Sequence, residues 1–139
     1  MHLNPLKIAV VDDDQIYHFI INRTVSKIHQ DSKILNFSNC ADFFNFLKRN
    51  ITNNDQLPDL VLLDLNTPFM NGWDFLESYK GIKPSLEKPM EIYLVSSSVD
   101  PNDAELANNN SHLSGFFSKP LTPEQLLEMI QKLCLKQKL

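Results

Sequence analysis

Leu60-Val61-Leu62-Leu63-Asp64 is a run of four apolar residues that ends in a carboxylate. An unbroken apolar run of this length is typical of a strand that is buried on both faces, as in a parallel sheet. Three other short apolar runs also end in reactive polar groups: Ile8-Ala9-Val10-Val11 before Asp12 and Asp13, Ile92-Tyr93-Leu94-Val95 before Ser96, and Gly115-Phe116-Phe117-Ser118 before Lys119. Because parallel strands end at one edge of their sheet, these groups are predicted to meet in one crevice.

Segments of helical periodicity separate the apolar runs, and this alternation predicts an α/β fold with a doubly wound parallel sheet. The five strands are expected at about residues 7–11, 33–37, 59–63, 90–95 and 115–118, with five helices in strict alternation. The residues by themselves do not give the order of the strands. Both common doubly wound orders place a ligand at the carboxyl edge, where the sheet reverses direction.

Apolar spacing predicts which side of each helix faces the core. For the first helix, the residues expected on the buried face are Ile16, Phe19, Ile20, Thr24 and Ile28. For the last helix, they are Leu126, Leu127, Ile130, Leu133 and Cys134.

Two helix starts are encoded locally. Asp100-Pro101 and Thr122-Pro123 each combine a capping side chain with proline at the first helical position, and Gln125 completes a capping box with Thr122. The segment Asn108-Asn109-Asn110-Ser111 has low helix propensity, so the fourth helix is expected to be short.

The length of 139 residues predicts one domain over residues 1–139, without a separate output domain. A net charge of -4 and the lack of a Lys/Arg-rich run argue against nucleic acid as the main partner. No apolar stretch approaches the roughly 20 residues of a membrane span, and the N-terminus lacks the apolar core of a signal peptide. A cytoplasmic protein is therefore expected, with Cys40 and Cys134 as reduced, buried thiols.

The acidic residues after the first strand indicate a metal site. Asp14 is expected to cap the following helix, but three adjacent carboxylates, Asp12-Asp13-Asp14, repel one another. A hard cation with oxygen ligands relieves this repulsion, and Mg²⁺ commonly takes one or two carboxylates together with water and phosphate oxygens. The four histidines show no spacing of metal ligands and are predicted to be surface or helix residues.

Asp64 is the candidate nucleophile. A carboxylate beside a metal ion is stabilised as an anion, and its oxygen can attack phosphorus to make an aspartyl phosphate. Ser96 offers a hydroxyl to the same crevice. Lys119 directly follows an apolar strand, so its ammonium needs an anionic partner at that edge. Pro120 after it is a candidate for a cis peptide bond.

With these residues in place, the chain resembles the receiver domain of two-component response regulators over essentially its whole length. Val10-Val11-Asp12-Asp13 is similar to the acidic pair of the family's first strand. Leu60 to Gly72 resembles the segment around its phosphoacceptor, Ser96 stands at its Ser/Thr position, and Lys119-Pro120 matches its Lys-Pro pair. Together the four motifs, in order and at compatible spacing, are highly specific.

The resemblance implies a flavodoxin-like strand order of 2-1-3-4-5 and a stand-alone, single-domain response regulator. It implies that Asp64 accepts a phosphoryl group from a histidine of a sensor kinase or phosphotransfer protein. Mg²⁺ would be bound by Asp13, Asp64 and the backbone carbonyl of Asn66, with Asp12 acting largely through water. Lys119 and Ser96 would each contact a phosphoryl oxygen.

The resemblance also implies a switch. Ser96 would move toward the phosphoryl group, and Phe116, at the family's aromatic switch position, would fill the vacated space. Thr67 departs from the bulky apolar residue that is usual at its position and is expected to alter access to Asp64. Output is expected through docking of an unknown downstream protein to the fourth and fifth helices, since the chain ends soon after the fifth.

Several alternatives remain open. A relay intermediate would pass its phosphoryl group on to another histidine. A Mg²⁺-dependent phosphatase of the haloacid-dehalogenase type needs a general acid two residues after the nucleophile, where this chain has Asn66. A flavodoxin-like cofactor module is disfavoured because the sequence has just three glycines and no Gly-rich loop after the first strand. The aspartates there would also repel a nucleotide phosphate. A degenerate receiver is disfavoured by the complete acidic, hydroxyl and lysine set. The protein is thus expected not to be an enzyme beyond its own phosphorylation and dephosphorylation.

Overall fold

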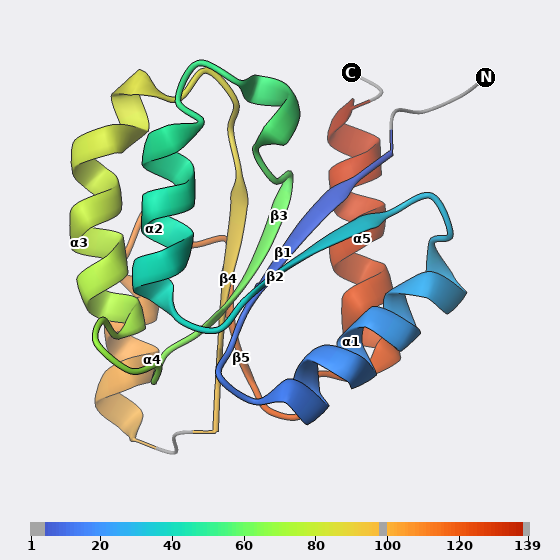
Figure 1. The fold of residues 1–139 in the computed structure, drawn as a ribbon. Coiled ribbons are helices and arrows are strands. Elements are labelled where there is room, and N and C mark those ends of the chain that lie inside the picture. The colour runs from blue at the N-terminus through green and yellow to red at the C-terminus, as the bar shows by residue number, and fades with distance from the viewer. Residues whose placement is uncertain (1–4, 98–99, 138–139) are drawn as a thin grey trace.

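The computed structural model describes residues 5–97 and 100–137, and the chain alternates between strands and helices throughout this part (Figure 1). The strands are β1 (Lys7–Val11), β2 (Lys33–Phe37), β3 (Leu60–Asp64), β4 (Glu91–Ser96) and β5 (Gly115–Ser118). The helices are α1 (Gln15–Ile28), α2 (Cys40–Arg49), α3 (Gly72–Ile82), α4 (Pro101–Asn108) and α5 (Pro123–Gln137). Two 3₁₀ turns, η1 (Asn54–Gln56) and η2 (Lys83–Ser85), lie in the connections before β3 and β4.

The five strands form one parallel sheet in the order β2-β1-β3-β4-β5, which confirms the flavodoxin-like topology. Helices α1 and α5 cover one face of the sheet, and α2, α3 and α4 lie on the other side (Figure 1). The chain order reverses at β1, which has β2 on one side and β3 on the other. Ligands in doubly wound folds bind outside the carboxyl ends of the strands near such a reversal, so this edge is where a site is expected.

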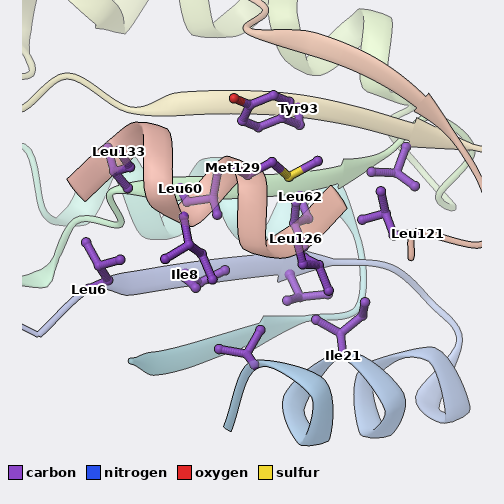
Figure 2. Close-up of a cluster of buried hydrophobic side chains, with 14 residues drawn as sticks. Leu6, Ile8, Ile21, Leu60, Leu62, Tyr93, Leu121, Leu126, Met129 and Leu133 are labelled. Carbon is purple, nitrogen blue, oxygen red and sulfur yellow. The ribbon is translucent and has the colours of Figure 1, made fainter. Parts of the chain in front are cut away.

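Each face of the sheet has its own hydrophobic cluster. Toward α1 and α5, Ile8 and Leu62 of the sheet pack with Leu126 and Met129 of α5 (Figure 2). On the other face, Phe43 of α2 joins the aromatic and aliphatic residues of α3. Strand β3 lies between β1 and β4 and is buried at every position, which explains its unbroken apolar sequence.

The predicted core face of α1 is wrong at three of its five positions, whereas Ile28 packs against the core cluster as expected. Ile16, Phe19 and Ile20 are 71%, 63% and 53% exposed, and the residues that the helix buries are His18, Ile21 and Val25. Apolar residues occupy more than half of the circumference of α1, so more than one set satisfies helical spacing. Which set is buried depends on how the helix is rotated about its axis against the sheet. Apolar spacing within the helix does not determine that rotation.

The α5 prediction holds at three of its five positions, and Cys134, expected as a buried thiol, is only partly buried against the core. Leu126, Ile130 and Leu133 are buried as expected, whereas Leu127 is 36% exposed and Met129 is buried in its place. Leu127 lies about 100° around the helix from Leu126, so the two cannot both point at the sheet.

The helix starts are those predicted from sequence. The Asp14 carboxylate accepts hydrogen bonds from the N–H groups of the first turn of α1, and Asp100 does the same at α4. Thr122 and Gln125 exchange the two hydrogen bonds of a capping box before α5. Helix α4 is short, as expected, and Ala107 is the residue that it buries.

Helix α3 begins unusually close to the sheet. The N–H of Gly72 donates to the carbonyl of Leu65 over 2.7 Å. A Cβ atom on Gly72 would lie 3.0 Å from a methyl carbon of Leu94 and 3.1 Å from Cα of Leu65. The next residue, Trp73, donates its indole N–H to the Asp103 carboxylate over 3.3 Å and so links α3 to α4.

Candidate functional site

Three carboxylates meet at the carboxyl edge of the sheet. Asp12 and Asp13 directly follow β1, and Asp64 ends the neighbouring strand β3. One carboxylate oxygen from each lies within 4.8 Å of the others. Asp12 and Asp64 are buried, with 1% and 7% exposure, and Asp13 is exposed. Two of the three acids are thus held inside the protein, and the third faces solvent.

Lys119, immediately after β5, brings a positive charge to these acids. Its ammonium lies 2.5 Å from Oδ2 of Asp12 and 3.6 Å from Oδ2 of Asp64. It also lies 4.6 Å from the ring centroid of Tyr17 in the first turn of α1, within range of a cation–π interaction. Burial by itself lowers the pKa of Lys119, but the hydrogen bond to Asp12 and the charge of Asp64 outweigh it and raise that pKa. Lys119 is therefore protonated at neutral pH. Its peptide bond to Pro120 is cis.

Asp64 is less favourably placed as an anion. Burial, with the nearby charge of Asp12, raises the pKa of Asp64 above its ordinary value. The charge of Lys119 and the hydrogen bond from the N–H of Asn66, at 3.3 Å from Oδ1, act in the opposite direction without cancelling the rise. Since Lys119 is shared with Asp12, the cluster has an excess of negative charge that a bound cation would relieve.

Ser96 ends β4 at the same edge and is fully buried. Its strand neighbour Val95 pairs with Asp64 in the sheet register, so Ser96 lies one residue beyond that pair. The backbone carbonyl of Ser96 accepts a hydrogen bond of 2.9 Å from the N–H of Lys119. The ends of β4 and β5 therefore lie next to each other at this edge, with Ser96 on one strand and Lys119 directly after the other.

Thr67 connects the loop after Asp64 to the start of α2 through hydrogen bonds. Its side chain is buried and donates a hydrogen bond of 2.7 Å to the carbonyl of Met70. It accepts another, of 3.1 Å, from the N–H of Cys40 at the start of α2. The hydroxyl thus has a structural function, and its effect on access to Asp64 stays a prediction. In the same loop, Phe69 has a φ of 73° and an exposure of 94%.

Phe116 lies in β5 opposite Leu94 of β4. It is partly buried and packs against the hydrophobic cluster on the α2 and α3 face, together with Leu113. The ring is thus on the same side of the sheet as α4, the helix that follows Ser96 in the chain. The switch functions of Phe116 and Ser96 stay predictions.

The sequence reasoning missed two residues of α1 that border the site, Tyr17 and His18. Burial, followed by the charges of Asp12 and Asp64, raises the pKa of the Tyr17 phenol. His18 was expected to be a surface or helix residue. It is a helix residue but is 6% exposed, and its Nε2 lies 2.7 Å from the backbone carbonyl of Asp12. Both residues follow the acids by about one helical turn, and this spacing could have indicated that they lie beside the site.

The donor set fits Mg²⁺. Its hard oxygen atoms come from Asp12, Asp13 and Asp64, which lie close enough to share one ion, and the exposed Asp13 leaves room for water ligands. The carbonyl of Asn66 stays a predicted ligand, two residues after Asp64.

The chain was then compared with known proteins. A family model described as the response regulator receiver domain matches residues 8–131. The chain belongs to this family. Receiver domains are phosphoacceptors in two-component signalling, and phosphorylation on aspartate with Mg²⁺ bound nearby is typical of them.

Solved structures agree with the fold of this receiver domain. A two-component response regulator from Cytophaga hutchinsonii superimposes with a TM-score of 0.84 at 24% identity, over 95% of this chain and 98% of that one. A CheY-like receiver domain protein from Methanospirillum hungatei gives a TM-score of 0.74 at 21% identity, over 96% and 98% of the two chains.

Two curated relatives are regulators. The receiver is 31% identical over 132 residues to the transcriptional regulatory protein FlgR of Helicobacter pylori, covering 91% of this chain and 29% of that protein. It is 22% identical to the probable methanogenesis regulatory protein FilR2 of Methanothrix harundinacea, over 94% of this chain and 82% of that protein. The chain therefore spans less than a third of the length of FlgR. Among the described residues, no helix is both long and apolar enough to cross a bilayer.

Proposed function

We propose that this receiver acts alone in the cytoplasm and accepts a phosphoryl group on Asp64 from a phosphohistidine of a sensor kinase or phosphotransfer protein. The observation that carries the proposal is the convergence of Asp64 with the Asp12 and Asp13 carboxylates and the Lys119 ammonium. An Asp64 oxygen attacks phosphorus, the P–N bond of the donor breaks, and its electron pair stays on the imidazole nitrogen. The product is an aspartyl phosphate.

The surrounding residues stabilise the charge of this transfer. Asp13, Asp64 and the Asn66 carbonyl are the proposed direct ligands of Mg²⁺, with Asp12 acting mainly through water; the ion supplies charge neutralisation at the phosphoryl oxygens. Lys119 exchanges its contact with Asp12 for a phosphoryl oxygen, and the Ser96 hydroxyl donates to another. Catalysis is by positioning and electrostatics, and the protein is the substrate of the reaction, not an enzyme acting on others.

Incubation with a small acyl-phosphate donor and Mg²⁺, followed by intact-mass measurement, tests the phosphoacceptor. We expect one phosphoryl adduct on the wild type, loss of the adduct when EDTA replaces Mg²⁺, and no adduct on Asp64→Ala. An adduct that persists in Asp64→Ala would refute the assignment of Asp64.

The phosphodonor is proposed to dock on the exposed apolar face of α1, formed by Ile16, Phe19 and Ile20. A donor imidazole has to come within bonding distance of Asp64, so the surface around it must cover the rim of the site. This face starts two residues after Asp14, and the exposed ring of Phe69 lies in the loop after Asp64. An apolar helix that carries the phosphohistidine is the occupant that fits these requirements.

Ile20→Lys separates docking from chemistry, because it places a charge on this face without altering the acidic site. Transfer from a phosphorylated histidine phosphotransfer protein is expected to slow at least about tenfold, which corresponds to loss of one interface anchor. Phosphorylation by the small acyl phosphate should remain at the wild-type rate. The matched control is Leu135→Lys, which charges a leucine of α5 that is 63% exposed, against 53% for Ile20. Equal rates for both variants with the protein donor would argue against docking on α1.

Output is proposed to occur by phosphorylation-dependent docking of a downstream protein to the α4 and α5 surface. Helix α4 is the next element of the chain after Ser96, and Ala107 is the residue that it buries. A small change at Ser96 is therefore able to bias the position of α4. Hydrogen exchange of α4 should differ between the phosphorylated and unphosphorylated forms; identical exchange would oppose the proposal.

The second candidate function is a phosphorelay intermediate, favoured by the solvent-facing side of the acidic cluster at Asp13. Phosphorylated protein mixed with unphosphorylated histidine phosphotransfer proteins distinguishes the two functions. A relay intermediate returns the group to a histidine, whereas a terminal regulator releases it as inorganic phosphate.

A further inference from the structure

We propose that His18 is a positioning residue for the Asp12–Asp13 pair. This inference rests on the proposed function, since it concerns how the Mg²⁺ site is held in shape. His18 lies in the second half of the first turn of α1, with 6% exposure, and both of its ring nitrogens have partners. Nε2 is 2.7 Å from the backbone carbonyl of Asp12. A carbonyl only accepts hydrogen bonds, so Nε2 carries the hydrogen and donates.

The other side of the ring is anchored to the sheet. Nδ1 of His18 lies 2.8 Å from the side-chain amide of Asn36 in β2. The Asn36 amide also lies 3.0 Å from the side-chain amide of Asn22, one turn further along α1. The imidazole thus connects three segments at the edge of the sheet: α1, β2 and the turn between β1 and α1.

The contact completes the hydrogen bonding of Asp12. The N–H of Asp12 donates to the carbonyl of Phe37, Oδ1 accepts from the N–H of Asp14, and Oδ2 accepts from Lys119. The hydrogen bond from His18 satisfies the remaining group, the carbonyl, which is buried. Without it, the peptide that joins Asp12 to Asp13 has a buried acceptor with no donor, and rotation of that peptide toward water would move both carboxylates.

Groups that orient metal ligands from behind commonly change metal affinity about 10- to 100-fold when they are removed. His18 acts through a backbone group, so we expect the lower end of that range. His18→Leu should weaken Mg²⁺ binding about tenfold in calorimetric titrations of the unphosphorylated protein. His18→Gln keeps an N–H donor at the end of the side chain and should recover most of that affinity.

A readout without metal separates this proposal from the proposed function. In EDTA, the amide hydrogen of Asp14, which is bonded to Oδ1 of Asp12, should exchange faster in His18→Leu than in the wild type. The control is His29→Leu, which removes the histidine at the other end of α1 and should leave both the exchange rate and the Mg²⁺ affinity unchanged. Should His18→Leu not fold, Asn36→Ala removes the second partner of the imidazole from an exposed position and is expected to weaken Mg²⁺ binding two- to threefold.

The proposal is overturned when His18→Leu, or Asn36→Ala in its place, binds Mg²⁺ like the wild type and protects Asp14 equally, or when His18→Gln is as weak as His18→Leu. A wild type that binds no Mg²⁺ would instead refute the proposed function, and exchange at Asp14 would still decide the role of His18.

Discussion

At Tyr17, two parts of one side chain have opposite effects on stability. The ring lies under the Lys119 ammonium, which favours the folded state. The hydroxyl is buried and has no hydrogen-bond partner among the described residues, which disfavours it. The ring therefore helps to hold Lys119 at the site, while the hydroxyl oxygen destabilises the folded state.

Tyr17→Phe is accordingly expected to raise the free energy of unfolding by about 1 kcal/mol, because it removes the unpaired hydroxyl and keeps the ring. Urea denaturation in the absence of Mg²⁺ measures this change. Tyr17→Leu, which removes the ring as well, should lower stability instead. A less stable Tyr17→Phe would mean that the hydroxyl has a partner, such as an ordered water molecule.

How far single residues were predictable depended on their surroundings. Asp64, Asp13 and Lys119 could be found from sequence because each stands at or just after the end of an apolar run. Parallel strands bring such ends together whatever the packing of the helices. His18 could not be found in this way. Its role depends on a backbone carbonyl and on a side chain of β2, and sequence spacing carries information about neither.

At the scale of elements, the strand boundaries were predicted to within one residue, whereas the buried face of α1 was not. A strand in the middle of this sheet is buried on both faces, so its composition suffices to identify it. A helix is buried on one face, and α1 has apolar residues on two. The apolar side chains left outside, Ile16, Phe19 and Ile20, are those that the proposed phosphodonor would cover.

The two glycines of α3 give a matched prediction. Gly72→Ala places a methyl group against Leu65 and Leu94, where backbone as well as side-chain atoms stand in the way. We expect a loss of about 1 to 3 kcal/mol of unfolding free energy by overpacking. Gly81→Ala, in the same helix with no atom within 4 Å of the new methyl group, should gain about 0.5 to 1 kcal/mol. Thermal unfolding of both variants checks the pair, and a neutral Gly72→Ala would show that α3 is free to move away from β3.

For the molecule as a whole, the acidic site links stability to pH and to metal. Burial, followed by the charge of Asp12, raises the pKa of Asp64 above its ordinary value of 3.8, so the folded protein binds this proton more tightly than the unfolded chain does. The stability contributed by the protonated group is fully present below pH 3.8 and is lost as the pH rises through the folded-state pKa. Above that pH, the metal-free protein carries a destabilising carboxylate.

Asp64→Asn removes this carboxylate. In EDTA at pH 7, the variant is expected to be more stable than the wild type by about 1 kcal/mol, after allowance for solvent screening. The difference should shrink as the pH falls toward 4. Added Mg²⁺ should also shrink it at pH 7, because the ion stabilises the wild type more than the variant. Melting temperatures over this pH range, with and without Mg²⁺, provide the measurement. A stability difference that depends neither on pH nor on Mg²⁺ would contradict the view that the Asp64 carboxylate destabilises the metal-free protein.

The hydrogen bond between Trp73 and Asp103 gives the proposed motion of α4 an optical readout that needs no added label. Trp73 is the one tryptophan of the sequence, so all indole emission comes from the point where α3 meets α4. A carboxylate at the indole N–H influences both the wavelength and the intensity of that emission. If α4 moves as proposed, stopped-flow fluorescence during phosphorylation would time that movement, and its rate could be compared directly with the formation of the adduct.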